Sequence, residues 1–117
     1  MANKVYYLST CSTCQRIMGD LPLEGFVKQD IKTEPITEAQ LQEMKTLAGS
    51  YEALFSRVAM KYKAWGLKEK NLSETDYKNY ILEEYTFLKR PVFIVDNQIF
   101  IGNSKKNVAA LTEQILK

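Results

Sequence analysis

Two cysteines, Cys11 and Cys14, are the residues of this chain best suited to chemistry. The 117 residues contain no other cysteine and no histidine. The lack of histidine excludes Ser-His-Asp triads and Cys-His dyads within one chain. A single C-x-x-C supplies two of the four ligands of a usual structural zinc site, so we expect no metal. A disulfide across so few residues would restrict the unfolded chain very little. What remains is a redox or nucleophilic thiol pair, or two cysteines that merely pack.

The position of Cys11 in the chain favours a reactive thiol. Cys11 follows an apolar segment typical of a buried strand, and small polar residues around it are typical of a helix start. Free N–H groups at a helix N-terminus favour a thiolate and lower the pKa of a cysteine there. Without histidine, we expect further stabilisation from the hydroxyls of Thr10, Ser12 and Thr13 and from arginines. Cys14, one turn later, is placed to attack a mixed disulfide on Cys11.

Three arginines, Arg16, Arg57 and Arg90, stand among sixteen basic residues. A guanidinium matches the geometry of an oxyanion in a way that an ammonium does not. Arg90 directly precedes Pro91, which restricts the backbone and holds the side chain in one direction. For each arginine a solvated or ion-paired surface position remains the alternative.

The elements that must position these residues follow the order β-α-β, three helices, then β-β-α. Thr37 and Gln40 form a capping box, and Asp96-Asn97 separates two short apolar runs as in a hairpin. The spacing predicts strands over 4–9, 25–31, 91–95 and 98–101, and helices over 14–21, 37–48, 54–65, 73–88 and 104–115. A β-α-β unit gives a parallel pair and the hairpin an antiparallel one, so we predict an α/β fold with a mixed sheet.

In the predicted 54–65 helix, one buried face carries residues at helical spacing. These are Leu54, Val58, Tyr62 and Trp65.

Composition narrows the function classes. Hydrophobic residues make up 45% and charged residues 26% of the chain, which is typical of a globular protein, and the net charge of +2 gives no drive toward nucleic acid. No apolar run is long enough to span a membrane, and the N-terminal apolar segment is too short for a signal peptide. We expect one cytoplasmic domain over 1–117.

Several motifs together resemble the arsenate reductase (ArsC) family, which includes glutaredoxin-like YffB proteins and Spx regulators. These motifs are Y-L-S-T-C-S-T-C-Q-R at 7–16, E-A-L-F-S-R at 52–57, L-K-R-P-V-F at 88–93 and I-G at 101–102. The resemblance runs from about residue 4 to residue 115. It implies a thioredoxin-like fold, with a four-stranded mixed sheet and a helical insertion at about 37–88 between the second and third strands.

The resemblance also implies an activity and the residues that carry it. Cys11 falls on the family's nucleophile, Arg57 on its insertion arginine, and Arg90 on the arginine before its cis-proline, here Pro91. The implied protein is a thiol-dependent oxidoreductase that reduces arsenate-like oxyanions or mixed disulfides, with Cys14 or glutathione resolving the intermediate. Ser12, Thr13 and Pro91 would position the substrate and backbone.

No bound cofactor is implied. Glutathione, glutaredoxin or thioredoxin would supply the electrons. Arsenate reductases proper carry a third arginine near the fourth strand, whereas the segment 98–103 here has none, and Lys105 and Lys106 begin the last helix. That departure argues against efficient arsenate reduction.

A redox-sensing regulator of the Spx type is the alternative function. Such a protein uses the same C-x-x-C as a switch and binds RNA polymerase. The stretch 57–70 holds five basic residues and one acidic residue, which suits either a docking surface or a solvated helix face.

Overall fold

The structure is a computed structural model that describes residues 3–117. Two compact units make up the chain: residues 1–34 with 90–117, and residues 35–89. The described part of the chain has no helix of the length and apolar character needed to cross a membrane. The predicted single domain with an insertion at about 37–88 stays a prediction.

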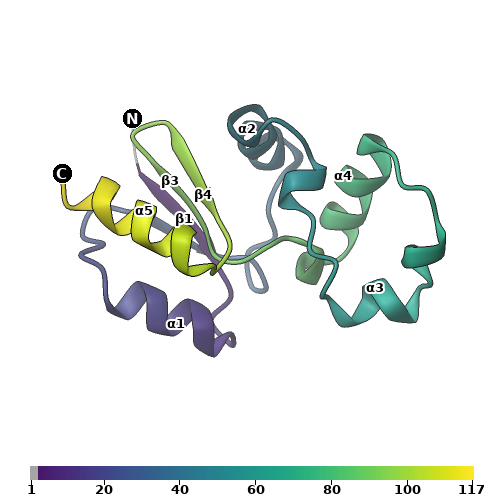
Figure 1. The fold of residues 1–117 in the computed structure, drawn as a ribbon, viewed down its shortest axis with the longest axis horizontal. Coiled ribbons are helices and arrows are strands. Elements are labelled where there is room, and N and C mark those ends of the chain that lie inside the picture. Colours follow the sequence, from purple (N-terminus) through teal and green to yellow (C-terminus); the bar gives the residue numbers. More distant parts are fainter. Residues whose placement is uncertain (1–2) are drawn as a thin grey trace. The chain divides into compact units, whose positions relative to one another are not determined.

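The first unit holds the sheet and two helices (Figure 1). Its elements are β1 (Lys4–Tyr7), α1 (Ser12–Gly19), β2 (Val27–Asp30), β3 (Val92–Val95), β4 (Gln98–Ile101) and α5 (Lys105–Ile115). The strand order is β2-β1-β3-β4, with β1 parallel to β2 and antiparallel to β3, and β3 antiparallel to β4. The predicted four-stranded mixed sheet is confirmed.

The register of the strands places the core of this unit on the sheet face that α1 and α5 cover. Phe93 of β3 lies opposite Val5 on one side and Phe100 on the other, so their side chains share a face. Ile17 of α1 and Leu111 of α5 pack against this row in one buried cluster. Both helices are therefore held against the same sheet face, and the start of α1 is fixed by that packing.

The strand β2 lies at an edge of the sheet and is shorter than the predicted strand over 25–31. Its first residue, Val27, is 52% exposed, whereas Gln29 is buried and donates from Nε2 to the Glu34 carbonyl oxygen at 3.0 Å. An edge strand pairs on one side only, so the alternation expected for a half-buried strand is weak here.

The hairpin between β3 and β4 turns at the predicted Asp96-Asn97 pair. Both residues have positive φ angles, 51° and 64°. This is the conformation of a type I′ turn, whose twist matches that of the flanking strands.

The regular elements of the second unit are all helices. It contains α2 (Glu38–Ala48), α3 (Met60–Ala64) and α4 (Glu74–Glu83), with the 3-10 helices η1 (Glu52–Leu54), η2 (Leu67–Glu69) and η3 (Tyr85–Phe87). The helix α2 begins at the predicted capping box, in which Gln40 N–H donates to Thr37 Oγ1 at 3.1 Å and Thr37 N–H donates to Gln40 Oε1 at 3.0 Å.

The predicted helix over 54–65 is confirmed only in its second half, as α3 (Met60–Ala64), and its first half is wrong. The chain leaves η1 at Phe55, which adopts an extended conformation and forms an antiparallel bridge with Leu88. Ser56 N–H donates to the Phe87 carbonyl oxygen at 2.7 Å, and Lys89 N–H donates to the Leu54 carbonyl oxygen at 2.9 Å. Val58 is consequently 93% exposed rather than on a buried helix face.

The predicted helix over 73–88 also ends early. At Glu84 the backbone becomes extended, with φ −138°, and the Glu84 carboxylate accepts from the Thr86 N–H and hydroxyl. This caps η3 and brings Phe87 onto the face of Phe55, with ring centroids 5.0 Å apart. Pairing between segments distant in sequence thus overrides helical periodicity at both places.

Candidate active site

The two cysteines lie at the start of α1, as the sequence predicts. Cys11 is the N-cap residue, with an extended backbone of φ −93° and ψ 112°, and its N–H donates to the Leu8 carbonyl oxygen at 3.0 Å. Both thiols are free, with Cys11 partly exposed and Cys14 fully buried. One sulfur is therefore open to solvent while its neighbour is held inside.

The surroundings of Cys11 favour its ionised form. Partial burial works against ionisation, but the backbone N–H of Cys14, the Cys14 thiol, the N–H of Thr13 and the charge of Arg90 outweigh it and lower the pKa of Cys11. These N–H groups lie in the first turn of α1, where the helix dipole also favours a thiolate. Cys11 is the expected thiolate.

The pKa of Cys14 is shifted in the opposite direction from that of Cys11. Burial raises the pKa of the Cys14 thiol to about 11, and the polar contact with Cys11 and the charge of Cys11 act in the same sense. The N–H of Leu8 and the charge of Arg90 only partly compensate. The site therefore pairs an accessible thiol, whose lowered pKa favours ionisation, with a buried thiol whose raised pKa favours the protonated form.

Arg90 and Pro91 lie at the entry to β3, in the same unit as the cysteines. The peptide bond between them is cis, as the resemblance implied. Pro91 is buried, and its carbonyl oxygen accepts from the Gly102 N–H at 2.9 Å, so the loop after β4 is tied to this proline. The positive charge of Arg90 acts on both cysteines. Arg90 is therefore close enough for its charge to favour a lower pKa of both Cys11 and Cys14.

Of the three predicted hydroxyl residues, Thr13 acts on Cys11 through its backbone. Its N–H, rather than its hydroxyl, is among the groups that lower the Cys11 pKa. Ser12 is the first residue of α1 and is exposed, and Thr10 is exposed in the preceding turn. The positioning roles of Ser12 and Thr13 stay predictions.

A small polar network that sequence patterns did not indicate braces the loop before Cys11. Ser9 donates from its hydroxyl to Asp30 Oδ2 at 2.5 Å, and Gln15 Nε2 donates to the Ser9 carbonyl oxygen. The Ser9 hydroxyl is the main reason that the pKa of Asp30 is lowered. Because Asp30 ends β2 and Gln15 belongs to α1, this network joins the sheet to the helix just ahead of Cys11.

Arg57 belongs to the second unit, and its contacts there are well defined. Its Nη2 donates to Glu52 Oε2 at 2.7 Å and to the Tyr77 hydroxyl at 2.8 Å, and its guanidinium lies 5.5 Å from the centroid of the Tyr77 ring. Glu52 is the main cause of a raised Arg57 pKa. Arg57 is thus a fixed, charged guanidinium, and its role toward Cys11 stays a prediction.

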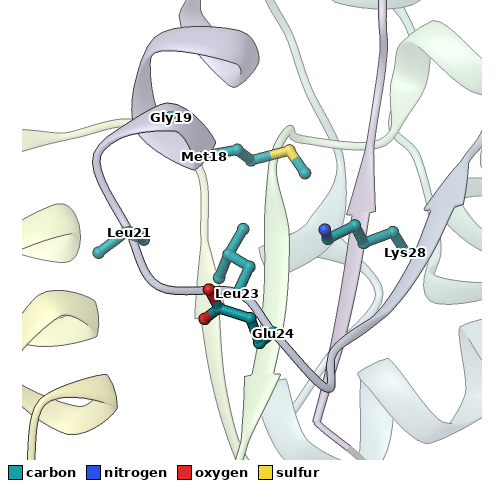
Figure 2. Close-up of a pocket in the computed structure, with 6 residues that line it drawn as sticks. All are labelled: Met18, Gly19, Leu21, Leu23, Glu24 and Lys28. Atoms are coloured by element: carbon teal, nitrogen blue, oxygen red, sulfur yellow. The ribbon is translucent and has the colours of Figure 1, made fainter.

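Apart from the thiol pair, a metal-ligating cluster or the cavity in Figure 2 would be the alternative candidate sites within residues 3–117. No group of three or more potential metal-ligating side chains forms within residues 3–117. The cavity of about 420 Å³ lies at the far end of α1, where Met18, Leu23 and Lys28 approach one another. It contains neither cysteine, so the candidate chemistry stays at the helix start.

Comparison with known proteins places the chain in a family. The model of the ArsC family matches residues 6–111, which include both cysteines and the Arg90-Pro91 pair. No curated protein matches the chain significantly.

Solved structures share the fold at low sequence identity. An ArsC family related protein from Bacteroides fragilis is 19% identical over 95% of this chain and 99% of that chain, with a TM-score of 0.74. A YffB protein is 16% identical over 94% and 98% of the two chains, with a TM-score of 0.76. An arsenate reductase from Vibrio cholerae is 20% identical over 99% and 96%, with a TM-score of 0.70. These likenesses confirm the predicted thioredoxin-like fold. Since the family model spans most of the sequence, the chain belongs to the ArsC family.

Proposed function

We propose that this member of a thiol-dependent oxidoreductase family uses Cys11 as the nucleophile and Cys14 as the resolving thiol. The observation that carries the proposal is the opposite shift of the two cysteines, with the Cys11 pKa lowered and the Cys14 pKa raised to about 11. A thiolate is the nucleophile in disulfide exchange, and it must be accessible to its substrate. Cys11 meets both conditions.

In the first step, the Cys11 thiolate attacks one sulfur of a substrate disulfide. A bond forms between Cys11 and that sulfur, the substrate S–S bond breaks, and the other half leaves as a thiolate that takes a proton from water. With an arsenate-like oxyanion, Cys11 would instead form an S–As bond, one bond from arsenic to a hydroxyl would break, and that hydroxyl would take a proton from solvent and leave as water.

In the second step, Cys14 attacks Cys11 and releases the remaining substrate thiol. Once the Cys11 sulfur is in a mixed disulfide it carries no charge, so the contribution of that charge to the raised Cys14 pKa disappears. Cys14 then loses its proton to solvent more readily than in the reduced protein. The enzyme ends as a Cys11–Cys14 disulfide, and two electrons have passed to the substrate.

The other predicted site residues have supporting roles in this proposal. Arg90 stabilises the Cys11 thiolate by its charge, and the N–H of Thr13 acts in the same direction. We assign Arg57 to binding an anionic substrate, since Glu52 and Tyr77 hold its guanidinium in one orientation. Ser12 and Pro91 would line the substrate's path to Cys11.

Glutathione, glutaredoxin or thioredoxin would return the protein to its dithiol form. Glutathione could also resolve the intermediate in place of Cys14. Disulfides and arsenate remain the two substrate classes, and the segment Gln98–Ile101 of β4 offers no cationic side chain for an oxyanion.

The regulator alternative gains no specific support from the basic stretch 57–70. Two of its five cations are engaged within their own unit: Arg57 with Glu52, and Lys61 with Glu84, each at 2.7 Å. A stretch whose charges are partly neutralised is a weaker docking surface than the sequence alone indicates.

The proposal is tested by measuring turnover of two substrates, a glutathione mixed disulfide and arsenate. The proteins compared are wild type, Cys11→Ser and Cys14→Ser. Cys11→Ser should reduce both rates to background, since it removes the attacking sulfur. Cys14→Ser should accumulate a mixed disulfide on Cys11, visible as a mass increase equal to the bound thiol. If glutathione resolves the intermediate, Cys14→Ser should instead retain turnover at high glutathione.

Lys106→Gln is a matched control, since Lys106 is exposed on another helix and should leave the rates unchanged. Turnover that survives Cys11→Ser would contradict the proposal. A wild-type protein that reduces neither substrate but is captured by RNA polymerase would favour the regulator.

A further inference from the structure

Two acceptors hold the guanidinium of Arg57 in the second unit, and they share one of its nitrogens. Nη2 donates to Glu52 Oε2 at 2.7 Å and to the Tyr77 hydroxyl at 2.8 Å. Because Nη2 carries two N–H groups, these two acceptors saturate it. No other hydrogen bond or ion pair joins Arg57 to a residue in 3–117, so the N–H groups of its Nε and Nη1 stay open.

The saturation of Nη2 limits how Arg57 can receive an anion. A guanidinium binds an oxyanion most strongly through two parallel N–H···O bonds from neighbouring nitrogens. Both edges of the guanidinium that can form such a fork include Nη2, which lies beside Nη1 on one edge and beside Nε on the other. Arg57 therefore offers a fork to an incoming anion only after one of its two acceptors has left Nη2.

Glu52 and Tyr77 differ in how firmly they are held. Tyr77 is only 8% exposed, and its ring packs on Phe55 with centroids 4.9 Å apart. The Glu52 side chain is 55% exposed and has no hydrogen-bond partner in residues 3–117 other than Arg57. An ion pair with this exposure is weak, because solvent screens it. Glu52 is therefore the acceptor that an anion displaces, while Tyr77 stays on the guanidinium.

The backbone beneath Glu52 stays fixed when its side chain moves away. The Glu74 carboxylate at the start of α4 accepts from the Tyr51 N–H at 2.7 Å and from the Glu52 N–H at 3.1 Å. Tyr77 belongs to the same helix, so α4 holds both the base of the Glu52 side chain and the Tyr77 hydroxyl. The Glu52 carboxylate can thus leave Arg57 and return by side-chain rotation alone.

We propose that Glu52 is a specificity-determining residue, whose carboxylate occupies the anion-binding edge of Arg57 in the free protein and must be displaced by an anionic substrate. Tyr77 is the positioning residue that keeps the guanidinium oriented when Glu52 leaves. The inference rests on the proposed role of Arg57 in binding substrate. The competition favours a dianionic oxyanion over a single carboxylate, which has the same charge as Glu52 but lacks its attachment to the chain.

Titration with sulfate at constant ionic strength, followed by the NMR signal of the Arg57 Nε–H, tests the inference. Sulfate is an unreactive tetrahedral dianion. Glu52→Gln removes the competing charge and should tighten sulfate binding by about two- to five-fold, the strength of an exposed ion pair. Glu38→Gln is the matched control, because it removes the same charge from a 2.7 Å pair with Lys78 in the same unit. It should bind sulfate as wild type does.

Tyr77→Phe should have the opposite effect and weaken sulfate binding by about three-fold or more, because the guanidinium loses a hydrogen bond while the ring still packs on Phe55. Tyr80→Phe, on the same helix, is its control, since the Tyr80 hydroxyl has no hydrogen-bond partner in residues 3–117. In turnover of arsenate, Glu52→Gln should lower KM and leave kcat unchanged. Turnover of a neutral disulfide, bis(2-hydroxyethyl) disulfide, should have the same KM in Glu52→Gln and wild type.

Equal sulfate affinities of Glu52→Gln and Glu38→Gln, or acetate that binds at Arg57 as tightly as sulfate, would overturn the role of Glu52. Equal affinities of Tyr77→Phe and Tyr80→Phe would overturn the role of Tyr77. An Arg57 signal that sulfate leaves unchanged in every variant would overturn the inference together with the role of Arg57 in binding anions. The titration involves no turnover, so its outcome is independent of whether Cys11 is the nucleophile.

Discussion

Cys11 and Cys14 are separated by less than one helical turn, yet their environments drive their ionisation apart. Cys11 is partly exposed at the end of the helix where N–H groups have no helical partner, whereas Cys14 is buried within the first turn. Desolvation opposes ionisation of both, but only at Cys11 do the neighbouring polar groups and Arg90 prevail. This difference in burial is the basis for proposing Cys11 as the nucleophile and Cys14 as the resolving thiol.

Replacing Arg90 by glutamine should raise the pKa of Cys11 toward its ordinary value. The change removes the positive charge that favours the thiolate while keeping a side chain of similar length. The rate of Cys11 alkylation as a function of pH measures the shift. Lys89→Gln, which removes a charge at the adjacent position, is the control and should leave the profile unchanged. A Cys11 pKa equal in Arg90→Gln and wild type would show that Arg90 has no electrostatic role.

Residue types and spacing were enough to point to the thiol pair, whereas the role of Arg90 and the cis bond before Pro91 were predicted from the family resemblance; both motifs have a local signature. C-x-x-C after an apolar strand and R-P before another are visible in the sequence. The network of Ser9, Gln15 and Asp30 has no such signature. Its members lie up to 21 positions apart and meet only because β1 and β2 pair in register.

At the scale of elements, local signals predicted helix starts and turns well. The helices α2 and α4 begin at predicted polar residues, Thr37 and Ser73, and both have complete capping boxes. The hairpin turn also lies where Asp96-Asn97 predicts it. These features depend on hydrogen bonds between residues two or three positions apart, so the sequence contains most of the information.

The middle of the second unit shows where local signals fail. The apolar spacing from Leu54 to Trp65 is helical, but Phe55 pairs with Leu88 and stacks on Phe87 instead. That pairing joins segments more than thirty positions apart. No pattern within either segment indicates it, and the buried aromatic contacts offset the loss of helical hydrogen bonds.

Substituting Thr37 by alanine should destabilise the protein by about 1 kcal/mol, because α2 loses its N-cap acceptor. The free energy of unfolding in urea measures this. Thr46→Ala is the matched control on the same helix: its hydroxyl bonds only to the Gln42 carbonyl oxygen, and alanine is the better helix former. Thr46→Ala should therefore be neutral or slightly stabilising. Equal destabilisation by both substitutions would contradict a specific role for the cap.

At the scale of the whole molecule, carboxylates in both units share one direction of pKa shift. The pKa of Asp30 is lowered mainly by the Ser9 hydroxyl, and the pKa of Glu38 is lowered mainly by Lys78. The pKa of Asp76 is lowered mainly by the N–H of Ser73. At Glu84, burial opposes ionisation, but Lys61 and Thr86 outweigh it and the pKa is lowered. In the unfolded chain these groups return to ordinary values near 4, so the folded state binds fewer protons in acid.

The contribution of these carboxylates to the melting temperature should therefore be constant from about pH 5 to neutral pH, and it should fall as the pH is lowered through the folded-state values. The contribution of each lowered carboxyl is fully present above its unfolded pKa and is lost as the group becomes protonated in the folded protein. Circular dichroism melts across the acid range measure this. A melting temperature that stays constant or rises on acidification would contradict the assigned pKa directions.

The proposed reaction depends on Cys11 being the activated thiolate, and the pH dependence of Cys11 alkylation measures this property. The reduced protein is treated with iodoacetamide at a series of pH values, and the peptides that carry each cysteine are quantified by mass spectrometry. We predict that Cys11 reacts with an apparent pKa below the ordinary 9.0, and that Cys14 reacts only near its pKa of about 11. An apparent pKa of Cys11 at or above 9.0, or a Cys14 that reacts first, would contradict the account.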